Sequence, residues 1–290
     1  TKVTELFEIL SIQGGIRIPT SFNGLEAYLL YENRKKRFDH GFAAYYKTST
    51  DVTGSTFSSN IKKQTNVFLV NHQLKYALDH YKCLKAISTI RNDHILYLST
   101  NQATLYDSIE NYQQRIGTRL EYVFDNALDI SLNIKNGWQV KVYFEVSKRF
   151  ELNPKHKSKF YPGALMIAGF DARFHLPVLT KSVCANRCYV NASFGRERIL
   201  YHVGGTENWL IPQYEDQSAL QTSGEYIYSA LATEVRSYGY GARKASSVFG
   251  FNSELRIPFL QYLINQNWKN SMLRNFQFLA FIDAAYVWDG

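Results

Sequence analysis

The sequence predicts an all-β protein whose strands form an antiparallel transmembrane β-barrel, and three observations lead to this prediction. Aromatic residues make up 15% of the 290 residues, including 21 tyrosines and 19 phenylalanines, and such side chains pack well on pleated sheets. Nearly every segment alternates apolar and polar residues with a period of two, which is typical of strands. The alternating runs reach or exceed the roughly 9–11 residues that a transmembrane strand needs, and short turns alternate with long polar loops between them.

The strand prediction is clearest for residues 138–147. One phase of this run is apolar: Trp138, Val140, Val142, Phe144 and Val146. The other phase is polar or amphipathic: Gln139, Lys141, Tyr143, Glu145 and Ser147. Less regular runs predict further strands, for about eleven in all, at residues 5–19, 24–33, 40–48, 64–77, 83–97, 115–125, 164–175, 182–194, 248–259 and 275–288.

The connections between these runs fall into two classes. Short turns are expected at Asn33–Asp39, Asp79–Lys82, Asn133–Gly137 and Pro177–Lys181. Longer polar loops are expected at residues 49–63, 98–114, 151–163 and 198–246. We expect no helix of ordinary length and no linker that would divide residues 1–290 into domains.

Charged residues share one phase of several predicted strands. Asp171, Arg173 and His175, for example, alternate with Ala172 and Phe174. A charge that faced lipid at the bilayer midplane would cost about 2–4 kcal/mol, so the charged phase of a membrane barrel should face a polar lumen. A soluble β-sandwich would also show polar and apolar phases, and the alternation alone leaves this alternative open. The long strands and the unequal connections favour the membrane barrel.

Composition and motifs narrow the function classes. The formal net charge is +8, but the charges are scattered, and the longest basic run, Arg34–Arg37, is interpreted as a solvated turn. Nucleic acid is therefore not an expected partner. The histidines are dispersed without a nucleophile motif, and the three cysteines lack metal-ligand spacing. We expect no catalytic residue, no metal and no cofactor, so the protein is not predicted to be an enzyme.

The last predicted strand ends in two aromatic residues. Its even positions between Phe276 and Trp288 are all apolar or aromatic, and Tyr286 and Trp288 close the run. We expect these two rings to belong to an interfacial aromatic girdle. Asp283 lies on the opposite phase of the same strand.

Two acids and one arginine form a candidate site. Glu254, on the preceding predicted strand, points away from its apolar phase, as Asp283 does on the last strand. Two acids on neighbouring strands would attract a cation, and Arg236, in the loop before them, is a candidate because a guanidinium can bind carboxylates with paired hydrogen bonds. The alternative is that Arg236 is a solvated loop residue and that each acid pairs with a nearby base such as Arg256.

These residues also carry a resemblance to a known family. The stretches VRSYGYGARKASSVFGFNSELRIPF and FLAFIDAAYVWDG resemble the C-terminal half of the BamA/TamA-type barrels, the outer-membrane assembly and translocation superfamily also called bacterial surface antigens. In that family a long extracellular loop with a Val-Arg-Gly-Phe/Tyr motif folds back into the lumen. Its counterparts here are Val235, Arg236 and Tyr238, with Ser237 in place of the glycine. The two strands that follow match at Asn252, Glu254, Arg256 and Pro258, and at Phe281, Asp283, Val287 and Trp288.

The resemblance extends over roughly residues 115–290 and includes EYVFDNALDISLNIKNGW and LYHVGGTENWL further upstream. It implies that Arg236 is locked against Glu254 and Asp283. We expect the replacement of the motif glycine by Ser237 to alter a tight turn, because glycine reaches positive φ at little cost. Family barrels have sixteen strands, of which this chain would hold approximately the third to the thirteenth, so residues 1–290 are expected to lack strands at one or both ends.

The resemblance also implies a location, partners and a function. The expected location is the bacterial outer membrane, and the expected partners are its lipids, client outer-membrane or surface proteins, and accessory lipoproteins or periplasmic domains. The implied function is to insert or export those clients through a weakly paired seam that offers strand edges. The alternative is a barrel that serves as a membrane anchor, exporter or plugged pore for a fused or partner domain.

Overall fold

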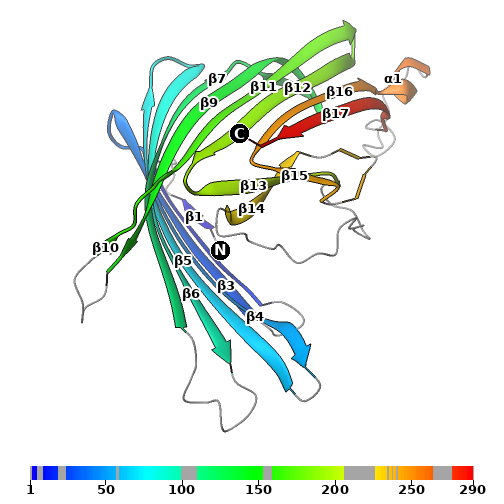
Figure 1. The fold of residues 1–290 in the computed structure, drawn as a ribbon. Coiled ribbons are helices and arrows are strands. Elements are labelled where there is room, and N and C mark those ends of the chain that lie inside the picture. Colours follow the sequence, from blue (N-terminus) through cyan, green and yellow to red (C-terminus); the bar gives the residue numbers. More distant parts are fainter. Residues whose placement is uncertain are drawn as a thin grey trace. The chain divides into compact units, whose positions relative to one another are not determined.

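A computed structural model describes most of the chain as β-strands (Figure 1). The described residues are 2–4, 9–18, 24–56, 59–98, 110–152, 159–205, 226–233, 235–236, 238–239, 241–263 and 276–289. They form two sheets and one short helix, α1 (Phe259–Leu263). Within these residues, no helix is long and apolar enough to cross a membrane.

The larger sheet follows the order of the chain. Its described strands run in the order β1-β2-β3-β4-β5-β6-β7-β9-β11-β12-β16-β17, and β8 and β10 both pair with β9. Their bounds are β1 Lys2–Thr4, β2 Leu10–Arg17, β3 Gly24–Asn33, β4 Phe38–Thr56, β5 Ser59–Ala77, β6 Lys82–Leu98, β7 Glu110–Asp125, β8 Leu128–Ser131, β9 Ile134–Glu151, β10 Lys159–Phe160, β11 Leu165–Leu179, β12 Ser182–Gly195, β16 Ser247–Ile257 and β17 Phe278–Trp288.

The smaller sheet has the order β14-β13-β15 and consists of β13 (Arg198–Val203), β14 (Tyr226–Thr233) and β15 (Arg243–Ala245). The chain divides into two compact units. Unit 1 comprises Thr1–Ala77, Leu84–Leu120 and Val146–Ala164, and unit 2 comprises Leu78–Cys83, Glu121–Glu145 and Leu165–Gly290.

Every predicted alternating run contains a strand, and the turns predicted at Asn33–Asp39 and Asp79–Lys82 connect paired strands. The turns predicted at Asn133–Gly137 and Pro177–Lys181 are shorter than expected, because β9 already begins at Ile134 and β11 continues to Leu179. The long polar loop predicted at residues 49–63 is wrong, because β4 continues to Thr56 and β5 begins at Ser59. The two strands stay paired beyond the stretch in which apolar residues alternate with polar ones, with Asp51 opposite Lys63. Alternation with apolar residues identifies a strand only where one face is apolar, so these polar extensions carried no signal.

Three other connections were also predicted as loops but contain strands. The segment 98–114 includes the start of β7, the segment 151–163 includes β10, and the segment 198–246 includes β13, β14 and β15. The strand predicted to end at residue 259 stops at Ile257 instead, and α1 begins after Pro258. Proline has no N–H to donate to a ladder, so the strand ends there.

Unit 1 has one apolar and one polar sheet face. Leu29, Phe42 and Phe68 share a face through the pairing of β3, β4 and β5, and they are 53%, 46% and 48% exposed. The opposite face carries an ion pair between Lys47 Nζ and Glu26 Oε1 at 2.9 Å. A sheet folded in water would bury the apolar face, so this arrangement is the reverse of a soluble one.

Unit 2 shows the same reversal. On β9 the predicted apolar phase is exposed at Trp138, Val142 and Phe144. On the other face of the unit's strands, Arg187 donates to both carboxylate oxygens of Asp171, at 2.7 and 3.2 Å. Large apolar side chains thus face outward while the ion pairs lie on the opposite face, which we call the inner face of unit 2.

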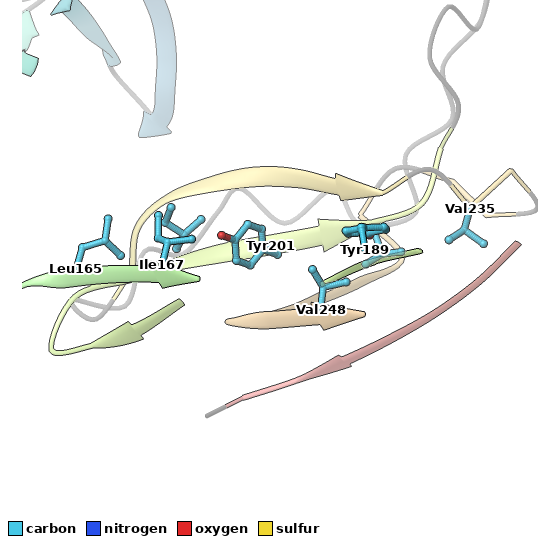
Figure 2. Close-up of a cluster of buried hydrophobic side chains, with 8 residues drawn as sticks. Leu165, Ile167, Tyr189, Tyr201, Val235 and Val248 are labelled. Atoms are coloured by element: carbon cyan, nitrogen blue, oxygen red, sulfur yellow. The ribbon is translucent and has the colours of Figure 1, made fainter. Parts of the chain in front are cut away.

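A buried apolar cluster holds the smaller sheet against this inner face (Figure 2). The main sheet contributes Leu165, Ile167, Tyr189 and Val248, and the segment from β13 to residue 235 contributes Ile199, Tyr201, Val203 and Val235. Gly250 makes room for the Tyr189 ring, because a Cβ at Gly250 would lie 2.1 Å from Tyr189 Cε1. Side-chain packing therefore anchors the inner sheet to the main sheet.

His202 makes the stability of this inner sheet depend on pH. Burial on β13 lowers the pKa of His202, and Lys244, its partner across the β13–β15 ladder, acts in the same direction. A lowered pKa disfavours the protonated folded state, so stability is full above the ordinary histidine pKa of about 6.5 and falls as pH drops toward the lowered value. We expect His202→Gln to reduce this acid sensitivity in thermal unfolding at pH 7.5 and pH 5. The exposed His80→Gln serves as the control and should keep it.

Candidate functional site

Two adjacent strands position the acidic residues of the candidate site. β16 and β17 pair antiparallel, with Asn252 opposite Asp283 and Glu254 opposite Phe281. Cross-strand partners point to the same side of a sheet, so all four side chains lie on the inner face. Glu254 and Asp283 are diagonal neighbours there, as their phases in the sequence predict.

The segment that carries Arg236 is tied to the end of β13. Val235 is 7% exposed and forms an isolated antiparallel bridge with Gly205. The Gly205 N–H donates to the carbonyl of Tyr238 at 2.8 Å. Gly204 has φ of 120°, and a Cβ there would lie 2.1 Å from the carbonyl oxygen of Gly239. The glycine pair thus permits a backbone approach that a side chain would block.

Arg236 contacts both acids. Its Nε donates to Asp283 Oδ2 at 3.0 Å, its Nη2 donates to Asp283 Oδ1 at 3.2 Å, and its backbone N–H donates to Asp283 Oδ2 at 3.2 Å. The same Nη2 also forms an ion pair with Glu254 Oε1. The side chains of Arg236, Glu254 and Asp283 are 16%, 17% and 3% exposed. One guanidinium therefore neutralises two carboxylates that are largely shielded from water.

The nearby base of the alternative interpretation is also engaged. Arg256 Nε donates to Glu254 Oε2 at 2.8 Å, and Arg256 Nη1 donates to the carbonyl oxygen of Asn133 at 2.8 Å. Each oxygen of Glu254 thus accepts from a different arginine. Arg236 thus binds both acids, as the first interpretation of the sequence expects, and Arg256 also binds Glu254, as the alternative expects.

Sequence reasoning did not assign two further residues to the site. Phe281 lies under the guanidinium, with Arg236 Cζ 4.1 Å from its ring centroid. Asn252 Nδ2 donates to Asp283 Oδ1 at 2.9 Å. Phe281 and Asp283 are two residues apart on β17, so their shared phase was a signal that could have identified the ring.

The remaining predicted residues are placed as follows. Tyr238 is 55% exposed, and Ser237 lies outside the residues that the structure describes. Tyr286 is 66% exposed, and its ring centroid is 5.8 Å from that of Trp288, with an angle of 22° between the planes. These two rings lie at the end of β17, but their role as a girdle stays a prediction.

The site offers charge and hydrogen bonds. It borders a cavity of about 370 Å³ on the inner face, lined by Arg173, His175, Ala185, Asn186, Arg187, Arg236, Asn252, Glu254 and Arg256. Among the described residues, no group of three His, Cys, Asp or Glu side chains could hold a metal ion. The arrangement of Arg236 can hold a chain segment in place, because moving it away would leave two carboxylates without their shared cation.

Comparison with known proteins shows the fold. The sequence matches no family model and no curated protein sequence. In structure, the chain is similar to BamA from Haemophilus ducreyi lacking POTRA domains 1-3, with a TM-score of 0.56 and 13% sequence identity. The match covers 97% of this chain and 52% of that chain, so this chain spans about half the length of the solved structure. The chain therefore has the fold of a BamA-type β-barrel.

Proposed function

We propose that this chain is the outer-membrane barrel of a factor that inserts or exports other outer-membrane or surface proteins. The observation that carries the proposal is Arg236, which contacts Glu254 and Asp283 on the inner face of a BamA-type fold. The exposed apolar face of each unit supports a bacterial outer-membrane location, since lipid is the environment in which such faces are stable.

The mechanism needs no cofactor and no covalent chemistry. Strand edges at a weakly paired seam would offer free N–H and C=O groups, and a client strand would pair with them by β-augmentation. The inner segment, held by Arg236 and the buried cluster, would brace the wall while the seam opens. Outer-membrane lipids surround the barrel in this scheme, and the clients, accessory lipoproteins and periplasmic domains are its protein partners.

Client insertion into vesicles tests this function. The protein is reconstituted in lipid vesicles, and a urea-unfolded β-barrel client is added. We expect the client to become protease-resistant several-fold faster than in vesicles that hold an unrelated closed barrel of similar size. Equal insertion rates in the two preparations would contradict the assembly function.

A plugged pore or exporter is the second candidate, and the inner sheet is the observation that favours it. β13 packs through Ile199, Tyr201 and Val203 onto the inner face, where it would obstruct a channel. In planar bilayers, a plugged pore would conduct little until the inner segment is released by Arg236→Ala. Conductance that rises in this variant, together with unassisted client insertion, would favour the pore over the assembly factor.

A further inference from the structure

The turn between β3 and β4 carries an unusual concentration of positive charge. Arg34, Lys35, Lys36 and Arg37 are consecutive and all exposed. Arg34 Nη2 pairs with Glu32 Oε2 at 2.7 Å. Among the described residues, the ammonium groups of Lys35 and Lys36 make no ion pair. The four cations have two carboxylates nearby, Glu32 and Asp39, and Asp39 Oδ2 lies 3.9 Å from Lys75 Nζ, so a positive surplus remains on the exposed turn.

An aromatic cluster on the apolar face of unit 1 adjoins this turn. Arg37 Cζ lies 4.7 Å from the ring centroid of Tyr76, and Arg37 Nη2 donates to the Tyr76 hydroxyl at 3.1 Å. The ring of Tyr76 is 5.1 Å from that of Phe38, which is 49% exposed. Aromatic rings with a polar partner on an otherwise apolar face are typical of the level where lipid headgroups meet hydrocarbon.

Two histidines on the same face extend this polar-aromatic level. His72 stacks on Phe42 with centroids 4.4 Å apart, and its Nε2 is 3.4 Å from Nδ1 of His40. Further from the turn, the same face continues with Ala44, Tyr46 and Phe68. The face therefore changes from apolar to amphipathic as it approaches the basic turn, and the turn itself lies just beyond the rings.

The next short turn along the chain, between β5 and β6, lacks the charge surplus. There Asp79 pairs with Lys82, with Oδ2 and Nζ 3.5 Å apart. Hydrogen bonds from the backbone N–H groups of Tyr81 and Lys82 lower the pKa of Asp79, so its carboxylate stays ionised beside the lysine. The β5–β6 turn therefore does not share the charge surplus of the β3–β4 turn.

We propose that Lys35, Lys36 and Arg37 bind the headgroup phosphates of anionic phospholipids in the leaflet that meets the β3–β4 turn. The inference rests on the proposed function in one respect, that the chain spans a membrane. Lysine acts as a mobile point charge and arginine can bind phosphate through two N–H groups, while the aromatic cluster holds Arg37 at headgroup level. Zwitterionic lipids carry a compensating charge and are bound less strongly.

Lipid retention by the purified protein tests this site. The full-length protein is titrated in non-ionic detergent with phosphatidylglycerol or phosphatidylcholine, and bound lipids are counted by native mass spectrometry. Each cation near an anionic headgroup contributes roughly a fivefold gain in affinity, so Lys35→Gln with Lys36→Gln should weaken phosphatidylglycerol binding about 25-fold. The matched control, Lys135→Gln with Lys181→Gln, removes two lysines next to other short turns and should change it less than twofold.

Three outcomes would overturn the proposal. They are equal retention of the two lipids, equal loss in the two double variants, and displacement of phosphatidylglycerol by inorganic phosphate, which would identify a site for the free anion. The assay contains no client protein, so it separates this inference from the proposed function. Loss of client insertion with intact lipid preference would count against the assembly function alone.

Discussion

Replacing Arg236 with alanine is expected to destabilise the protein by about 3 kcal/mol. Asp283 is 3% exposed and Glu254 is 17% exposed, so neither carboxylate can be fully rehydrated when the shared guanidinium is lost. Removing one partner of a buried ion pair costs about 3–5 kcal/mol, and the partial exposure of Glu254 places this case at the lower end. Arg256 still neutralises Glu254 in part, which leaves Asp283 as the main source of the loss.

Thermal unfolding of the refolded protein in detergent micelles, followed by circular dichroism, measures this effect. Arg236→Lys should recover part of the stability, because it restores the charge without the paired hydrogen bonds to Asp283. Arg243→Ala is the matched control, since Arg243 is an exposed arginine on the adjacent β15, and it should unfold like the wild type. Equal stability of the Arg236→Ala and Arg243→Ala proteins would show that Arg236 does not hold the inner segment.

Introducing arginine at Val142 is expected to destabilise the protein by about 2–4 kcal/mol in a membrane. Val142 is 45% exposed near the middle of β9, on the same face as Trp138 and Phe144. In water, an arginine at such an exposed strand position would change stability by no more than about 0.5 kcal/mol. At the bilayer midplane it would have to leave water, which costs several-fold more. The substitution therefore distinguishes a lipid-facing surface from a solvated one.

Folding into lipid vesicles gives the readout, since a folded outer-membrane barrel migrates differently on SDS gels before and after boiling. The folded fraction of Val142→Arg across a urea titration should fall below that of the wild type. Val142→Leu keeps the position apolar and is expected to fold normally. If the arginine and leucine variants fold equally well, the apolar face does not meet lipid.

The sequence predicted the local features of the fold well, because strand alternation is a local pattern. The alternation at residues 138–147 separates the exposed Trp138 and Val142 from the other phase of β9. The phases of Glu254 and Asp283 also predicted that both acids lie on one face, and the pairing of β16 with β17 puts them there. Each of these predictions depends on the fact that successive side chains of a strand point to opposite faces. This alternation is set by the local backbone and does not depend on residues far away in the chain.

The additional strands were missed for two reasons. The extensions of β4 and β5 lack the apolar alternation by which a strand is recognised. β13 alternates, with Ile199, Tyr201 and Val203 buried, but it has only six residues, fewer than a transmembrane strand needs. β14 also pairs parallel with β13, with Arg198 opposite Tyr226 across a long connection. Pairing over such a separation depends on the entropy of closing a loop and on contacts made after closure, neither of which leaves a local pattern.

The sequence by itself determined which faces are apolar and where the acids of the candidate site lie. The tertiary structure decided which cations reach those acids. Arg236 binds both carboxylates because Val235 is buried and the Gly204–Gly205 pair admits the backbone of the same segment, and Arg256 takes the second oxygen of Glu254. Such a position is set by packing between segments far apart in the chain, so no period or spacing within one strand could specify it.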